Sequence, residues 1–366
     1  MTLEDIALMM TPGIGVKSAV HLIECFSDAR KIFGASREEL EQKAGLRPDV
    51  ARQIVQRKGF ADAEREMEYC RRHDIRILAS TDTEYPPLLR DTPDYPHVLY
   101  VQGEVEALQA RCLAVVGTRR ATTYGLDMCN RLVAGLARRV PGICIVSGLA
   151  FGIDVAAHRA ALDAGIPTVA VLANPLPEVT PVQHTRVARE ILDHGGALVS
   201  ELPSRTKQKG TFYVARNRII AGLAAGCLVV ESPDSGGSLL TAHCADSYQR
   251  TVLALPGRAT DPTSAGTNHL IRNHKAQLVL SAGDIVRELM WDLGLDPATL
   301  PAEAPTRTLT PDEQTLLEAL PKGVVLPFEA LAGTGGFDPG MLATLLVGLE
   351  LAGRVRQLPG NRYVKL

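Results

Sequence analysis

Six short apolar runs alternate with helix-like segments between residues 111 and 290, and this alternation is what most limits the possible folds. The runs lie at 112–116, 143–146, 168–172, 197–199, 227–230 and 252–255. An apolar run without polar alternation indicates a strand that is buried on both faces, as in a parallel sheet covered by helices. Right-handed crossovers between such strands build a doubly wound sheet. The sequence therefore predicts an α/β fold with a Rossmann-like domain over residues 111–293.

The segments that flank the predicted sheet have different patterns. Residues 1–80 read as helical, and a Gly-Ile-Gly turn at 13–15 between two amphipathic runs is typical of a helix-hairpin-helix. In that unit the turn amides and Lys17 could hold a phosphate, whereas a helical bundle that only packs on its neighbour is the alternative. Prolines stiffen a connector over residues 81–110, and Pro297, Pro301 and Pro305 indicate a linker over residues 294–309.

Residues 310–366 have the pattern of a winged helix. Thr310 and Glu313 form a predicted capping box, with Pro311 at the first helical position. Helices are expected near 312–320, 327–333 and 338–352, followed by a hairpin of strands at 354–358 and 362–366. Because the third helix carries no cation before Arg354, contact with another protein is favoured over the reading of duplex DNA.

The composition narrows the classes of function. With 39 Lys and Arg against 41 Asp and Glu, the net charge is −2, so any nucleic-acid site has to be a local patch. No cleavable signal pattern opens the sequence and no apolar run approaches the roughly 18 residues that span a bilayer, which predicts a cytoplasmic protein without membrane contact. The seven cysteines form no CxxC pair, so neither a disulfide frame nor a metal site is expected.

One stretch of the predicted sheet domain is strongly basic. No acidic residue lies between Glu201 and Glu231, and the stretch carries Phe212, Tyr213 and five cations. The cations are Arg205, Lys207, Lys209, Arg216 and Arg218. Cations interleaved with aromatic rings suit a single nucleic-acid strand, since charges hold phosphates and ring faces hold unstacked bases. The alternative is an ordinary solvated loop that leads into a core helix.

Three glycine-containing turns follow predicted strands, at the sheet edge where open parallel sheets bind ligands. The first turn, at 117–125, lacks a GxGxxG pattern and contains Gly117, Thr118, Arg119 and Arg120. Its arginines and threonines suit phosphate oxygens better than a dinucleotide. The second turn, at 147–154, includes Gly148, and the third is the SGGSLLT loop at 235–241. We expect the three turns and the basic stretch to converge on one edge of the sheet.

Asp154 and His158 are four residues apart on one predicted helix. This spacing would suit a catalytic pair, but no serine or cysteine nucleophile is obviously paired with them. The favoured interpretation is a carboxylate that caps the helix and pairs with a structural histidine.

Six blocks of sequence, together with the lead-in YPPLLRDTPDYPHVLYVQG, resemble the motifs of the DNA-processing protein A family (DprA/Smf). In order, the blocks are VVGTRRATTYG, VSGLAFGIDVAAHRAAL, LVSELP, FYVARNRIIAGL, VVESPDSGGSLLTA and LPGRATDPTSAGTNHLI. The resemblance implies a homodimer that binds single-stranded DNA, protects incoming strands in natural transformation and loads RecA recombinase onto DNA coated by single-strand-binding protein. It implies a protein that is not an enzyme and uses no cofactor, with SAM-like and winged-helix domains flanking the sheet.

The resemblance also implies a DNA pocket. The family's pocket arginine, lysine and aromatic residue fall on Arg119, Lys209 and Phe212, and Gly117, Gly148, Arg216 and Asn217 occupy matching positions. The predicted site further includes Thr118, Arg120, Lys207 and Arg218. We expect Arg119, Lys209 and Arg216 to hold phosphates and Phe212 to stack on a base. The chain departs from the family at Phe151, where an arginine is frequent, and in the loop at 173–184.

Two other functions are compatible with parts of the sequence. A nucleotide-binding hydrolase of the lysine-decarboxylase-like type could use Glu231 or Glu201 to polarise a water. Such enzymes carry a PGGxGT-type loop, whereas this chain has SGGSLLT without a partner acid close by. A protein scaffold is the third possibility, and it predicts no affinity for DNA.

Overall fold

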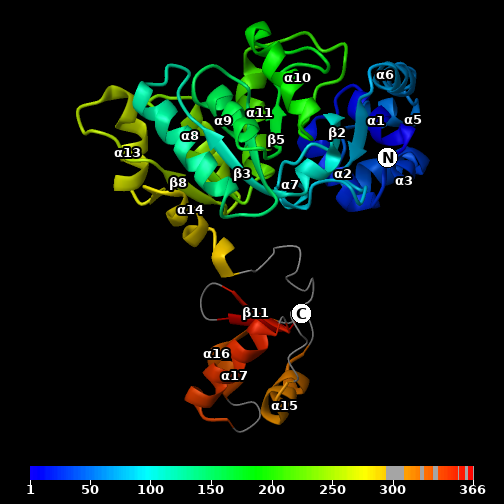
Figure 1. Ribbon diagram of the computed structural model, residues 1–366. Helices are drawn as coiled ribbons and strands as arrows, with labels where there is room; N and C mark the ends of the chain where they lie inside the picture. Colours follow the sequence, from blue (N-terminus) through cyan, green and yellow to red (C-terminus); the bar gives the residue numbers. More distant parts are fainter. Residues whose placement is uncertain (294–308, 322–324, 333–336, 353, 359–361, 366) are drawn as a thin grey trace. The chain divides into compact units, whose positions relative to one another are not determined.

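The computed structural model describes residues 1–293, 309–321, 325–332, 337–352, 354–358 and 362–365 (Figure 1). The chain divides into two compact units, unit 1 over residues 1–293 and unit 2 over residues 294–366. Except for residue 309, the linker predicted over 294–309 lies outside the described residues. No helix in the described ranges is both long and apolar enough to cross a membrane.

A nine-stranded sheet forms the centre of unit 1, and seven of its strands are parallel. From β3 (Arg111–Val116), the chain adds β4 (Ile143–Ser147), β5 (Thr168–Val171) and β6 (Ala197–Ser200) on one side. It then returns to the other side of β3 and adds β7 (Gly226–Val229), β8 (Thr251–Ala254) and β9 (Gln277–Leu278). The doubly wound, Rossmann-like sheet is therefore confirmed, and the strand order reverses between β3 and β7.

Two antiparallel strands extend the sheet beyond β6. The edge strand β1 (Arg76–Ala79) pairs with β2 (Val98–Gly103), which pairs with β6. The sequence prediction placed residues 76–79 in the helical segment and gave the connector at 81–110 no part in the sheet. In the structure this connector supplies β2, and it also contains α7 (Pro87–Arg90). Because β1 is a short edge strand whose first residue is exposed, it lacks the continuous apolar run of the central strands.

Helices cover both faces of the sheet (Figure 1). One face packs against α8 (Thr123–Ala137), α9 (Ile153–Asp163), α10 (Thr185–Asp193) and α14 (Ala282–Glu288), and the other against α11 (Thr211–Gly222), α12 (Ser238–Ser247) and α13 (Ala265–Arg272). Neighbouring residues of one strand enter different cores: Ile145 packs with Leu132 of α8, and Val146 packs with Ile219 of α11. Burial of each such side chain stabilises the fold by about 1.5–3 kcal/mol.

Six helices precede the sheet and pack into the same unit. They are α1 (Leu3–Met10), α2 (Val16–Phe26), α3 (Ala29–Gly34), α4 (Arg37–Ala44), α5 (Pro48–Val55) and α6 (Phe60–Arg72). A buried polar contact joins α1 to the residue before β2: Asp5 Oδ1 lies 3.1 Å from His97 Nε2. The Nδ1 atom of His97 lies 2.8 Å from the Ser80 hydroxyl, so the imidazole is held at both nitrogens.

Unit 2 is a winged helix, as predicted. It contains α15 (Pro311–Ala319), α16 (Phe328–Ala332) and α17 (Pro339–Leu351), and a sheet in the order β10 (Val325–Pro327), β12 (Arg362–Lys365), β11 (Val355–Leu358). The capping box of Thr310 and Glu313 is present at the start of α15. Leu316, Leu346 and Leu349 pack in its core, whereas strand β10 was not predicted.

Candidate nucleic-acid interface

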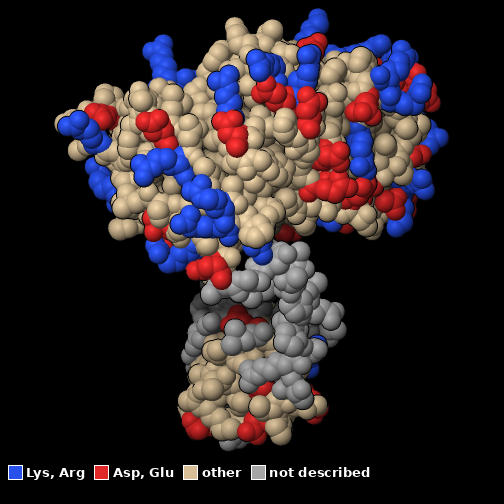
Figure 2. Space-filling model, in the orientation of Figure 1, with Lys and Arg blue, Asp and Glu red and all other residues tan. Residues whose placement is uncertain are grey.

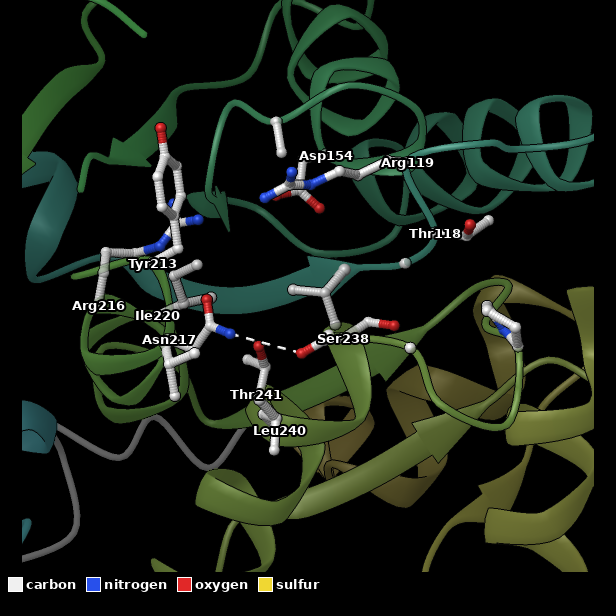
Figure 3. Close-up of a pocket in the computed structure, with 17 residues that line it drawn as sticks. Thr118, Arg119, Asp154, Tyr213, Arg216, Asn217, Ile220, Ser238, Leu240 and Thr241 are labelled. Atoms are coloured by element: carbon white, nitrogen blue, oxygen red, sulfur yellow. Dashed lines mark hydrogen bonds between the residues drawn. The ribbon is translucent and has the colours of Figure 1, made fainter. Parts of the chain in front are cut away.

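A cavity of about 260 Å³ lies beyond the carboxyl ends of β3 and β7, where the strand order reverses (Figure 3). Open α/β sheets bind ligands at such a switch point. The residues that line the cavity come from the end of β3, from the turns after β3, β4 and β7, and from helices α9, α11 and α12. They are Val116, Gly117, Thr118, Arg119, Ala150, Asp154, Tyr213, Val214, Arg216, Asn217, Ile220, Pro233, Gly236, Gly237, Ser238, Leu240 and Thr241.

The turn after β3 is held in place by Glu231, at the end of β7. The Glu231 backbone oxygen accepts a hydrogen bond from the Thr118 N–H at 2.7 Å. Its buried carboxylate accepts two more from Thr122, one from the N–H at 2.8 Å and one from the hydroxyl at 2.7 Å. With both ends of the turn fixed, the intervening Arg119 and Arg120 are exposed.

Arg119 and Tyr213 form the mouth of the cavity. The guanidinium carbon of Arg119 lies 5.5 Å from the centroid of the Tyr213 ring. The Tyr213 hydroxyl accepts a hydrogen bond from the Gln208 amide at 2.9 Å, which fixes the far end of the ring. Among the residues that the structure describes, no acidic partner forms an ion pair with Arg119. A cation beside an aromatic face can hold one phosphate and the base next to it.

Arg216 lies beneath this mouth and is 5% exposed. Its Nη1 atom donates to the carbonyl oxygen of Gly148 at 2.8 Å and to that of Val171. Any Cβ at position 148 would lie 2.1 Å from the same nitrogen, so Gly148 leaves the space that the guanidinium fills. Arg216 therefore joins α11 to the ends of β4 and β5. This placement favours a bracing role for Arg216, and the phosphate contact that the sequence suggested stays a prediction.

Asp154 and His158 are not paired, which corrects the sequence interpretation. Asp154 lines the cavity, and α9 begins after Gly152 without a side-chain cap. Burial raises the pKa of Asp154, although the nearby Arg216 offsets part of this shift.

His158 belongs to the core. The Thr168 hydroxyl donates to the Ile145 carbonyl oxygen at 2.7 Å, so His158 Nδ1 is the donor in its own 2.7 Å bond to that hydroxyl. Burial lowers the pKa of His158 to about 3, with a further contribution from the charge of Arg216. The histidine is therefore neutral near pH 7 and has a structural role.

The other predicted residues fall into two groups. Lys207 and Lys209 are exposed in the loop before α11, and they form no ion pair within the described ranges. The start of this loop is tied to α6, because the Ser204 N–H donates to Glu66 at 2.7 Å. Arg218 instead binds the Glu201 carboxylate and donates to the Asp94 carbonyl oxygen at 2.7 Å. Arg218 therefore forms an internal ion pair, and its predicted role in the DNA site stays a prediction.

The structure brings only part of the predicted set to the cavity. Gly117, Thr118, Arg119, Arg216 and Asn217 line it, whereas Arg120, Gly148, Lys207, Lys209, Phe212 and Arg218 do not. Phe212 is half-buried, and the adjacent Tyr213 takes the position at the mouth.

Helix α12 contributes residues that the prediction omitted. Ser238 and Thr241 line the cavity from its first turn, and Asn217 of α11 donates to the Gly237 carbonyl oxygen at 3.5 Å (Figure 3). The positive end of this ten-residue helix thus lies at the cavity, where it favours an anion. The SGGSLLT sequence could have indicated these residues, because this turn was already expected at the same edge of the sheet.

Charged side chains are distributed unevenly over unit 1. Residues 111–290 contain 19 Lys and Arg and 13 Asp and Glu, an excess of six positive charges. Figure 2 shows Lys and Arg gathered over α8, whereas Asp and Glu gather over part of the N-terminal helices. The sheet is therefore the electropositive part of unit 1, as contact with a polyanion requires.

Comparisons with known proteins agree on one family. The family model described as DNA recombination-mediator protein A matches residues 76–290, and that of the DprA winged helix domain matches residues 300–361. Protein Smf of Escherichia coli is 40% identical over 297 residues, which cover 79% of this chain and 77% of that protein. The putative DNA processing protein DprA of Mycobacterium tuberculosis is 35% identical, with 86% of this chain and 81% of that protein covered.

Two solved structures have a similar fold. DNA processing protein A from Streptococcus pneumoniae superposes with a TM-score of 0.69 at 30% identity, over 79% of this chain and 98% of that one. DNA processing protein A from Helicobacter pylori, whose structure was described for its single-stranded DNA binding mode, has a TM-score of 0.53 at 28% identity. That match covers 60% of this chain and 96% of the other.

Proposed function

Because the chain belongs to the DNA recombination-mediator protein A family, we propose that it binds single-stranded DNA at the cavity between β3 and β7. In this role it protects incoming strands during natural transformation and loads RecA recombinase onto DNA coated by single-strand-binding protein. It acts in the cytoplasm as a homodimer, by binding and without catalysis. The observation that carries the proposal is the exposed Arg119 beside the Tyr213 ring at the switch point of the sheet.

The binding mode that we propose separates phosphates from bases. Arg119, Lys207 and Lys209 supply exposed positive charge for phosphates, and Tyr213 supplies a ring for one base. Each stacked base contributes about 1–3 kcal/mol. Each neutralised phosphate adds about 0.7 to the slope of log affinity against log salt. Loss of a cation and loss of a ring therefore have different signatures in a salt series.

The contacts of two glutamates argue against the hydrolase alternative. Both carboxylate oxygens of Glu231 are bonded to Thr122, and the carboxylate of Glu201 is paired with Arg218. Neither glutamate is among the described residues that line the cavity. Asp154 does line it, but this side chain is buried. The cavity thus offers no exposed carboxylate to activate a water.

Fluorescence anisotropy tests the proposal with a labelled dT oligomer and a matched duplex over a range of salt concentrations. We expect preference for the single strand. Arg119→Ala lowers the salt slope by about 0.7, and Tyr213→Ala weakens binding by about five-fold or more with the slope unchanged. Phe212→Ala has the smaller effect of the two ring substitutions. Arg30→Ala, on the exposed surface of α3, is the matched control.

Three outcomes would overturn the proposal. The first is wild-type affinity in both Arg119→Ala and Tyr213→Ala, and the second is equal affinity for single strand and duplex. The third is turnover of nucleoside monophosphates that Asp154→Asn abolishes, because this result would identify a hydrolase. Strand exchange by RecA on DNA coated by single-strand-binding protein, with and without this protein, tests the loading role separately.

A further inference from the structure

The binding mode above leaves the surface position of Phe151 unexplained. Phe151 lies in the loop between β4 and α9, and its side chain is 45% exposed. Its neighbour Ala150 lines the cavity, as does Asp154 three residues later. An exposed phenylalanine forfeits the free energy of burial, so its position directly beside a ligand cavity calls for a partner from outside the chain.

The Phe151 ring is held by a second aromatic ring. The ring centroids of Phe151 and His184 lie 4.8 Å apart with an interplanar angle of 65°, which is an edge-to-face contact. His184 is itself buried, and its Nδ1 atom donates to the Leu149 carbonyl oxygen at 2.7 Å. His184 is therefore itself hydrogen-bonded to the loop that carries Phe151. A ring fixed in this way loses little conformational entropy when a ligand packs on it.

The turn that carries Phe151 is hydrogen-bonded to the turn that carries Arg119 and packs closely against it. The Ile153 N–H donates to the Thr118 carbonyl oxygen at 3.2 Å. The two backbones are so close that a Cβ on Gly152 would lie 2.2 Å from that oxygen and 2.7 Å from the carbonyl carbon of Arg119. Because the Arg119 side chain also lies against Tyr213, the turn that carries Arg119 contacts both the Tyr213 ring and the backbone of the loop that carries Phe151.

We propose that Phe151 is a second base-stacking platform of the interface. This inference rests on the proposed function, because it requires that the cavity bind a single strand. A strand whose phosphate is held at Arg119 stacks one base on Tyr213 and another on Phe151. Aromatic rings interleaved with cations are the general means of binding single strands without sequence preference, since every base has a π-face. Val182, two residues before His184, is also an exposed apolar side chain. The ligand class is the nucleobases of single-stranded nucleic acid.

The test compares Phe151→Ala and Phe151→Tyr with the wild-type protein on two strands of equal length, a dT oligomer and an abasic strand. Phe151→Ala is expected to bind the dT oligomer at least about five-fold more weakly, and Phe151→Tyr to retain binding. The salt slope stays unchanged, because no phosphate contact is removed. On the abasic strand, the difference between Phe151→Ala and the wild type disappears. Leu126→Ala, with a side chain of α8 that is 36% exposed, is the control.

The outcomes separate this inference from the proposed function. If the wild-type protein binds the dT oligomer and Phe151→Ala binds it equally well, the stacking role is refuted and the proposed function stands. Phe151 would then be available for contact with another protein. An equal loss on the dT and abasic strands would also refute stacking, because that loss does not depend on a base. If the wild-type protein binds no single strand, both proposals fail.

Discussion

Replacement of Arg216 by methionine tests whether this arginine braces the fold or contacts the ligand. Methionine keeps an unbranched apolar stem of similar length and removes the guanidinium. The substitution leaves the carbonyl oxygens of Gly148 and Val171 without their side-chain donor. It also removes the cation that partly offsets the burial of Asp154.

The expected loss of stability follows from these contacts. Two hydrogen bonds from a charged donor contribute about 1.5–3 kcal/mol each, and the guanidinium also offsets part of the burial of Asp154. Since the substitution also relieves the burial of the guanidinium, we expect a decrease of about 3–5 kcal/mol in the free energy of unfolding. Arg119→Ala, at an exposed position, should change it by less than about 0.5 kcal/mol.

The pH dependence provides a second signature. Burial raises the pKa of Asp154, so in the pH range between its unfolded and folded pKa values the folded protein binds more protons than the unfolded chain. Stability contributed by this group is therefore present at low pH and lost as the pH rises through the folded pKa. Without Arg216 the folded pKa rises further, so the deficit of the variant should be smaller at pH 5 than at pH 8.

Urea unfolding followed by circular dichroism measures both effects on the full chain, with strand affinity measured in parallel. The bracing role predicts low stability in Arg216→Met and normal stability with weak binding in Arg119→Ala. An Arg216→Met variant that unfolds like the wild type but binds single strands weakly would refute this reasoning. Arg216 would then be a ligand contact, as the sequence had suggested.

Two further predictions concern the scaffold. Gly125→Ala places a Cβ 2.4 Å from a Glu231 carboxylate oxygen. It should therefore lower the free energy of unfolding in urea by about 1–3 kcal/mol and weaken binding. The control Gly34→Ala, with open space at its Cβ, should do neither. Burial alone would raise the pKa of Asp5, but its contacts with His97 and Thr2 bring that pKa below the ordinary value. This stability is present above the unfolded carboxyl pKa of about 3.9 and lost as the pH falls through the folded value, so Asp5→Asn should be destabilised at pH 6 and approach the wild type near pH 3. A difference that does not change with pH would contradict this role.

The sheet was predictable because its central strands leave a strong signal in the sequence. Each parallel strand between β3 and β8 is buried on both faces, so its residues form a continuous apolar run that needs no knowledge of the neighbours. Strand β1 is stabilised by pairing with β2 and has an exposed first residue, so its local sequence gives little indication of a strand. Sequence patterns therefore reveal the core of this fold better than its edge.

The individual roles within the site were less predictable. They depend on where each side chain points, and the residue types in a segment do not determine this. Phe212 and Tyr213 are adjacent in sequence, but about 100° separates neighbouring residues around a helix, and only Tyr213 lines the cavity. The same ambiguity applies to Asp154 and His158. Their spacing allows contact, yet His158 instead donates to the Thr168 hydroxyl, and Asp154 lines the cavity.

The cations near the cavity are divided between two tasks. Arg216 and Arg218 both lie on α11, where backbone carbonyl oxygens accept from them, and Arg218 is also paired with Glu201. These contacts fix α11 against the sheet and so fix the Tyr213 ring at the mouth of the cavity. Charge that remains available to a strand is on Arg119 and the two lysines of the loop before α11. Substitutions in the first group should therefore reduce stability and affinity together, whereas substitutions in the second should reduce affinity alone.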